Sequence, residues 1–147
     1  MVTVGKTREA AARSWAESYA SRVTGGWRVR MASVAESRRR EPAARRREET
    51  AALLDRVPAG AFAVALDPAG RARDTGEFAA FLSGHKDRGR PVCFLVGGAH
   101  GLDGDALGGT ERLSLSPMTM AHELALVVLM EQIYRAFAHS TGRPYAK

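Results

Sequence analysis

The chain has 147 residues, of which 45% are hydrophobic and 26% charged, the composition of a single soluble globular domain over residues 1–147. No apolar run approaches the roughly 20 residues of a membrane span, and the N-terminal segment contains no hydrophobic signal sequence. One cysteine, Cys93, excludes an internal disulfide. We therefore expect a cytoplasmic protein that has no membrane anchor.

The net charge of +6 is concentrated in the N-terminal part of the chain. Residues 1–60 carry 13 Lys and Arg against 7 Asp and Glu, whereas residues 61–147 carry 9 of each. Much of the excess lies in the basic run 38–47, which can bind a polyanion by releasing its counterions. However, 19 of the 22 basic residues are arginine, and nearby glutamates offset part of the charge. RNA contact and a solvated helix face both stay open for this run.

The hydrophobic pattern predicts strands and helices in alternation along the first two thirds of the chain. The predicted elements are a strand at 2–4, a helix at 8–23, a strand at 27–35, a helix at 42–57, a strand at 61–67, a helix at 74–89 and a strand at 91–96. In the first helix, a stripe that includes Trp15 and Tyr19 is expected to face the sheet. Strands that alternate with helices form a mostly parallel sheet, so the predicted fold class is α/β.

The last third of the chain is organised differently. Turn-forming residues surround a short predicted strand at 113–115. Residues 122–140 then form the most apolar helix of the chain, with apolar side chains on every side between Leu124 and Met130. Because such a helix must be covered all round, we expect either the rest of the domain or a second subunit to cover it.

The segment FLVGGAHGLDG, residues 94–104, follows an apolar strand with four glycines and a histidine. Ligands of parallel sheets bind beyond the carboxyl ends of the strands, and the strands that end near Asp67 and Gly97 provide two such places. The glycines match neither the dinucleotide-binding fingerprint nor the P-loop. From this pattern alone, a tight turn and a ligand-binding loop both stay open.

Metal binding is not expected. The four histidines have no paired spacing, and no second cysteine completes a zinc site.

Several segments together resemble one family in order and spacing: VALD with AGR, EFA, FLVGGAHGL, LSLSPMTMAH, EQIYRAF and GRPY. They are similar to the small SPOUT-class methyltransferases that methylate ring nitrogen three of a pseudouridine in large-subunit ribosomal RNA. The resemblance covers nearly the whole chain and is strongest from residue 61 to residue 145. It implies a mostly parallel α/β sheet with a C-terminal trefoil knot, the cofactor S-adenosylmethionine and a homodimer.

The resemblance also implies which residues form the site. Those implied for the cofactor are Leu66, Gly97, Gly98, Gly101, Leu115, Ser116, Pro117, Met118, Thr119 and Met120. His122, Arg135 and Tyr145 are the implied catalytic candidates, and the C-terminal tail is expected to complete the pocket of the other subunit. A ring N–H acceptor must lose a proton, which requires a base or a donor that stabilises the developing oxyanion.

Four positions depart from the family pattern, and all lie near the expected reaction centre. Ala146 replaces a tail histidine, Leu126 replaces an arginine, Ala121 replaces a proline, and His100 stands where acidic or amide residues are common. The segments implied for the cofactor keep the pattern.

Three functions stay open. The resemblance favours methylation of ribosomal RNA. A divergent paralogue that methylates a small nitrogen heterocycle is the second, with His100 as its catalytic base. The third is a protein that binds the cofactor or RNA without catalysis.

Overall fold

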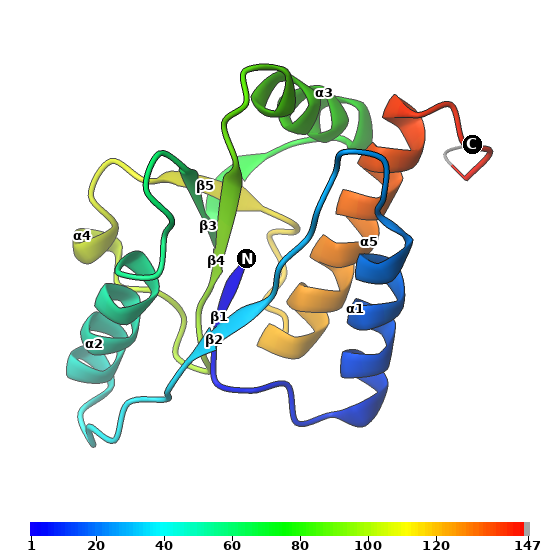
Figure 1. Ribbon diagram of the computed structural model, residues 1–147. Helices are drawn as coiled ribbons and strands as arrows, with labels where there is room; N and C mark the ends of the chain where they lie inside the picture. Colours follow the sequence, from blue (N-terminus) through cyan, green and yellow to red (C-terminus); the bar gives the residue numbers. More distant parts are fainter. Residues whose placement is uncertain (146–147) are drawn as a thin grey trace.

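The computed structural model describes residues 1–145. Five strands form one sheet in the order β2-β1-β4-β3-β5, and every pair of neighbours is parallel (Figure 1). The strands are β1 (Val2–Val4), β2 (Ala32–Val34), β3 (Phe62–Ala72), β4 (Val92–Val96) and β5 (Glu111–Ser114). The helices are α1 (Ala10–Arg22), α2 (Pro42–Leu54), α3 (Thr75–Asp87), α4 (Gly104–Leu107) and α5 (His122–Ser140). The predicted α/β class is confirmed.

Helices cover both faces of the sheet. Val64 and Phe94 pack in one hydrophobic cluster with side chains of α1, α3 and α5, whereas Ala65 and Leu95 pack in a second cluster with α2 and α4. In Figure 1, α1 and α5 accordingly lie on one side of the strands, and α2 and α4 lie on the other. Successive residues of a strand point to opposite faces, which explains why residues 62–66 of β3 and all of β4 are apolar.

The strand predicted at 27–35 is shorter in the structure. Its pairing with β1 begins where Val2 lies opposite Ala32. Because β1 itself begins at Val2, residues 27–31 have no strand beside them in the described part of the chain. The terminal amine of Met1 instead donates a hydrogen bond to the carbonyl of Arg30 at 2.7 Å. The alternating pattern therefore continues past the end of the sheet.

The prediction that Trp15 faces the sheet is wrong, because its side chain is 62% exposed. Ala16 and Val23 form the buried side of the α1 region, with Tyr19 packed against the same cluster. Successive residues of a helix are rotated by about 100°, so Trp15 points away from the side on which Ala16 is buried.

The strand predicted at 61–67 is longer in the structure, because β3 continues to Ala72 after a bulge. The register between β3 and β5 shifts between Leu66 and Arg71, so the intervening residues protrude from the sheet. Gly70 lies so close to β5 that a Cβ atom there would be 2.7 Å from the carbonyl carbon of Arg112. Glycine therefore permits the bulge, which carries Asp67 beyond the regular strand.

Helix α4 was not predicted. It is a single turn whose N-terminus is capped by Asp103, since the Asp103 side chain accepts a hydrogen bond from the Ala106 N–H at 2.9 Å.

Helix α5 confirms the prediction for residues 122–140. Leu129 and Met130 are fully buried, but Leu124 is 53% exposed, and Val127 and Val128 are only partly buried. Residues 1–145 thus leave part of the apolar surface of α5 uncovered.

Candidate functional site

A pocket of about 160 Å³ opens at the carboxyl edge of the sheet. Three segments form it: the end of β3 with its bulge, the glycine loop that follows β4, and the loop that joins β5 to α5. Nine of the ten residues implied for the cofactor line it: Leu66, Gly97, Gly98, Gly101, Leu115, Ser116, Met118, Thr119 and Met120. The tenth, Pro117, is not in the lining.

The glycine loop is a tight turn packed against its own chain. The Gly101 N–H donates a hydrogen bond to the Gly98 carbonyl at 3.0 Å, and Gly101 has a φ of 76°, a conformation that favours glycine. A Cβ atom on Gly97 would lie 2.8 Å from the backbone carbon of Gly101. The turn itself therefore requires these glycines, and it also exposes bare backbone to the pocket.

Helix α2 supports this loop from behind. Thr50 accepts a hydrogen bond from the Asp103 N–H at 2.9 Å. The buried Glu49 accepts a hydrogen bond from the Ser37 N–H at 2.9 Å, and its other oxygen would lie 3.1 Å from a Cβ atom on Gly98. The loop is thus held between its own turn and two side chains of α2.

Asp67 lines the same pocket but was not among the predicted site residues. Its side chain accepts a hydrogen bond from the Ala69 N–H at 2.9 Å and forms an ion pair with Arg112 at 3.4 Å. An acidic residue directly after an apolar strand, at the carboxyl edge of a parallel sheet, is the signal that identifies it.

The four predicted catalytic residues lie in three places. His122 begins α5 and lines the pocket. His100 is exposed in the glycine loop and is not in the lining. Arg135 lies further along α5, about 20 Å from His122 at 1.5 Å per residue, and Tyr145 packs beside it. Within one chain, His122 and the Arg135–Tyr145 pair therefore cannot reach the same atom.

Arg135 and Tyr145 share one carboxylate oxygen. Arg135 donates hydrogen bonds to Oε1 of Glu131 at 3.0 and 2.7 Å, and the Tyr145 hydroxyl donates to the same atom at 3.2 Å. The hydrogen bond with Tyr19, followed by burial and the Glu131 charge, raises the pKa of Tyr145 to about 12. Glu131 also raises the pKa of Arg135 through its hydrogen bond. Tyr145 is thus a neutral donor and Arg135 a cation near neutral pH, so neither is a base.

A family model described as "Predicted SPOUT methyltransferase" matches residues 1–146. The chain belongs to the SPOUT methyltransferase family. This confirms the family that the sequence motifs indicated, and it makes the protein a methyltransferase.

Several relatives carry the name ribosomal RNA large subunit methyltransferase H. The protein of Gluconacetobacter diazotrophicus is 45% identical over 146 residues, which cover 99% of this chain and 94% of the relative. The protein of Gemmatimonas aurantiaca is 37% identical over 151 residues, which cover 100% of this chain and 97% of the relative. The protein of Geobacter sp. is 36% identical over 147 residues, which cover 99% of this chain and 96% of the relative.

The positions at which this SPOUT chain departs from the family pattern lie in different surroundings. Leu126 is 4% exposed and packs in the core rather than in the pocket. Ala121 is exposed at the N-cap position of α5, and its methyl side chain makes no capping hydrogen bond with that helix. Ala146 lies outside the described residues.

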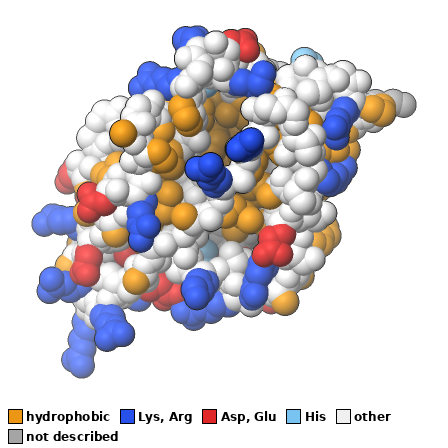
Figure 2. All heavy atoms as spheres, viewed as in Figure 1, with side chains coloured by type: hydrophobic (Ala, Val, Ile, Leu, Met, Phe, Trp, Pro, Cys, Tyr) orange, Lys and Arg blue, Asp and Glu red, His pale blue; other side chains and the backbone are white. Residues whose placement is uncertain are grey.

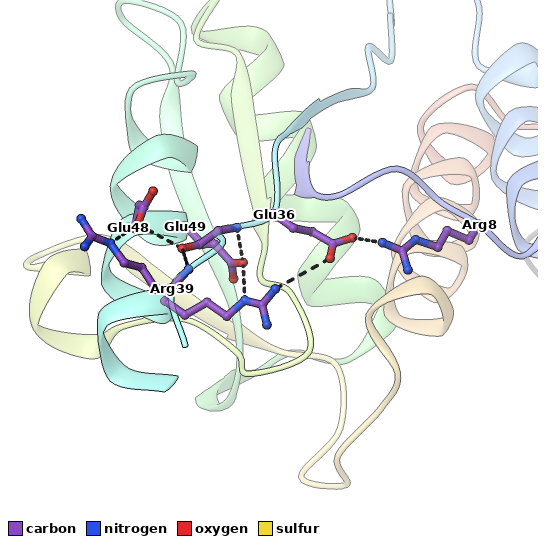
Figure 3. A network of polar contacts seen from close by, with 7 residues as sticks. Arg8, Glu36, Arg39, Glu48 and Glu49 are labelled. Carbon is purple, nitrogen blue, oxygen red and sulfur yellow. Dashed lines mark hydrogen bonds and ion pairs between the residues drawn. The ribbon is translucent and has the colours of Figure 1, made fainter. Parts of the chain in front are cut away.

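The basic run 38–47 precedes α2 and continues into its first turns. Figure 3 shows the ion pairs of Arg39 with Glu48 and of Arg8 with Glu36. Arg45 pairs with Glu36 and Glu49. The other four arginines of the run make no ion pair with the described residues: Arg38, Arg40, Arg46 and Arg47. Glutamates therefore neutralise only part of the run.

Among residues 1–145, no helix is long and apolar enough to cross a membrane. The same residues contain no group of three or more His, Cys, Asp or Glu side chains placed to hold a metal ion.

Proposed function

We propose that this chain uses S-adenosylmethionine to methylate a pseudouridine ring nitrogen in large-subunit ribosomal RNA. The observation that carries the proposal is the pocket at the carboxyl edge of the sheet. It gathers nine residues that were singled out from three separate sequence segments. The shared name of the relatives supports ribosomal RNA as the substrate. A ribosomal substrate also supports the proposal that the protein acts in the cytoplasm.

The residues of the pocket fit the cofactor. Leu66, Leu115 and Met120 offer apolar surfaces for a flat adenine ring, and the bare backbone at residues 97 and 98 offers N–H and C=O groups to the edge of that ring. The Asp67 carboxylate is an acceptor for a hydroxyl or ammonium group. When bound, S-adenosylmethionine supplies a methyl group attached to a positively charged sulfur.

His122 is the residue of the pocket best suited to take the proton of the acceptor ring. Of the four predicted catalytic residues, it alone lines the pocket. An imidazole nitrogen with a free lone pair can act as a general base. Arg135 and Tyr145 are suited to the complementary role, because both donate hydrogen bonds to an oxyanion or a phosphate.

The separation of these residues supports a homodimer. Because about 20 Å of helix divides His122 from Arg135, one active site needs the pocket of one subunit and the α5 end and tail of another. The exposed Leu124 and the partly buried Val127 and Val128 give α5 an apolar surface for such contact. The trefoil knot implied by the resemblance stays a prediction.

Titration calorimetry followed by methyl-transfer assays tests this function. We expect S-adenosylmethionine to bind, Asp67→Asn to weaken that binding, and the exposed Asp105→Asn to leave it unchanged. Methyl transfer is then measured with ribosomes and with a panel of small nitrogen heterocycles. Transfer to heterocycles alone would establish the divergent paralogue, with His100 as its candidate base. Cofactor binding without any transfer would establish the non-catalytic alternative.

A further inference from the structure

A second and larger cavity lies at the opposite end of the sheet. Its volume is about 530 Å³, against about 160 Å³ for the pocket at the carboxyl edge. It is lined by residues just before β3, the start of β4, the last turns of α3 and the segment 26–30 that precedes β2. In the upper half of Figure 2, a hollow shows hydrophobic side chains at its base and Lys or Arg side chains beside it. The proposed reaction uses none of its residues.

The lining of this cavity carries positive charge only. Arg28, Arg30, Lys86 and Arg90 line it, and no Asp or Glu does. None of these four cations forms an ion pair with the residues that the structure describes. A concave surface lined by one sign of charge concentrates its field and attracts ligands of the opposite sign. The rim therefore fits an anionic group, and arginine is well suited to phosphate.

The inner wall of the cavity is apolar and partly aromatic. Trp27 lines it and packs edge-on against Phe137, with ring centroids 6.1 Å apart. Leu82, Phe94 and Ile133 are further lining residues, and all three are buried. Such a wall can contact the flat or apolar part of an organic ligand, but it offers no favourable contact to a bare inorganic anion.

One buried polar side chain also lines the cavity. His85 is 6% exposed and stacks on Phe62 at a centroid distance of 4.5 Å, and its Nδ1 atom has no hydrogen-bond partner among the described residues. Burial, followed by the charges of Arg88 and Arg90, lowers the pKa of His85, so the ring is neutral near pH 7. A neutral imidazole has both a donor and an acceptor nitrogen, as recognition of a nucleobase edge requires.

We propose that this cavity binds a nucleotide, with its phosphate on Arg28 and Arg30 and its base against the wall that contains Trp27. The nucleotide is either an unpaired residue of an RNA chain or a free nucleoside phosphate, since both present the same chemistry. Stacking of a base on an aromatic side chain combined with a basic rim is a common mode of single-strand binding. The cavity lies away from the proposed cofactor pocket, so binding there does not depend on methyl transfer.

The chain has two tryptophans, which allows a direct test. Trp15 is exposed on α1, and Trp15→Phe leaves Trp27 as the reporter in the cavity. The fluorescence of this variant is titrated with uridine 5′-monophosphate and, separately, with a single-stranded decauridylate. S-adenosylhomocysteine is kept saturating so that the other pocket is filled. We expect a saturable change, with at least tenfold weaker binding after Arg28→Ala and Arg30→Ala. The matched control, Arg13→Ala with Arg56→Ala, removes the same charge elsewhere and should bind as before.

The two ligands separate the two sources. Decauridylate that binds at least tenfold more tightly than the monophosphate identifies an RNA segment, and equal affinity identifies a free nucleotide; either result supports the site. The proposal is overturned if neither ligand gives a saturable change, or if inorganic phosphate binds as tightly as the nucleotide. It is also overturned if the paired arginine substitutions bind like the control. Circular dichroism of each variant establishes that a loss of binding is not a loss of folding.

Discussion

The hydroxyl of Tyr145 donates a hydrogen bond to Oε1 of Glu131 at 3.2 Å, on the same oxygen that Arg135 binds. The Arg143 N–H adds a hydrogen bond to the Ala138 carbonyl at 2.9 Å. Together these contacts hold the described part of the tail against the last turns of α5. The tail and α5 therefore present the neutral phenol of Tyr145 and the guanidinium of Arg135 from one fixed place, which the proposed second subunit can use as a unit.

Tyr145→Phe removes the hydroxyl and keeps the ring. If the phenol donates a hydrogen bond to the pseudouridine ring that accepts the methyl group, we expect the rate of single-turnover methyl transfer to fall about 100-fold. This is the size of effect seen when one hydrogen-bond donor to a developing oxyanion is lost. Thr141→Ala is the control, because it also removes a hydroxyl near the C-terminal end of α5. That hydroxyl donates a hydrogen bond to the Phe137 carbonyl. Unchanged transfer by Tyr145→Phe, or a loss of the proposed dimer in size-exclusion chromatography, would show that the tail has only a structural role.

His122→Gln removes the proposed base at the pocket. We expect methyl transfer to fall by about 100-fold or more, while calorimetry finds nearly unchanged cofactor affinity. His139→Gln serves as control, since His139 is exposed at the other end of the same helix. If the two variants transfer methyl groups equally well, another residue takes the proton.

Most of the residues that the resemblance implies for the cofactor gather in one pocket because they follow strands whose carboxyl ends meet at one edge. The apolar runs of β3 and β4 predict buried parallel strands, whose carboxyl ends lie at the same edge of a sheet, and the structure shows that these two strands are neighbours. The distance between His122 and Arg135 did not enter that prediction, since a motif gives the order of residues and not their separation in space.

The larger cavity could not be predicted from the sequence. Trp27 and Val29 alternate with arginines as they would in a strand, yet no strand lies beside them in the described part of the chain. Their apolar side chains line a cavity wall whose other parts come from α3 and β4, far away in sequence.

The wrong prediction for Trp15 has a simpler cause. Its position on α1 is rotated by about 100° from that of the buried Ala16, and hydrophobicity alone does not show where the buried side of a helix ends.

Gly97→Ala tests the packing of the glycine loop. The added Cβ atom would lie 2.8 Å from backbone of the same turn, so the loop must shift. We expect a loss of stability of about 1–3 kcal/mol and weaker binding of S-adenosylmethionine. Gly109→Ala is the control, because nothing lies within 4 Å of a Cβ atom there. Urea denaturation and calorimetry measure both effects, and equal results for the two variants would contradict the described packing.

His85 makes stability depend on pH in a defined direction. Burial, followed by the charges of Arg88 and Arg90, lowers its pKa from the ordinary 6.5. The unfolded chain then binds a proton more readily than the folded one, so this contribution to stability is present above pH 6.5 and is lost as the pH falls. We expect the loss of unfolding free energy between pH 7.5 and pH 5.5 to be smaller in His85→Phe than in the unsubstituted protein. An equal or larger loss would contradict this assignment.

The basic run supplies a further prediction. Arg46 and Arg47 make no ion pair with the described residues, so they are available to contact phosphates. If they do, Arg46→Ala with Arg47→Ala should weaken binding to ribosomes and lower the slope of log affinity against log salt by about two. The pair Arg13→Ala and Arg56→Ala controls for net charge. An unchanged slope would identify the run as a solvated helix face.

The most direct test of the central claim is transfer of a labelled methyl group from S-adenosylmethionine to ribosomes that lack this modification. The account predicts label in the large-subunit RNA, located at a pseudouridine by digestion and mass spectrometry, and an initial rate of labelling that is lower by about 100-fold or more with His122→Gln at matched protein concentration. Tight binding of the cofactor without any label in ribosomal RNA would contradict it.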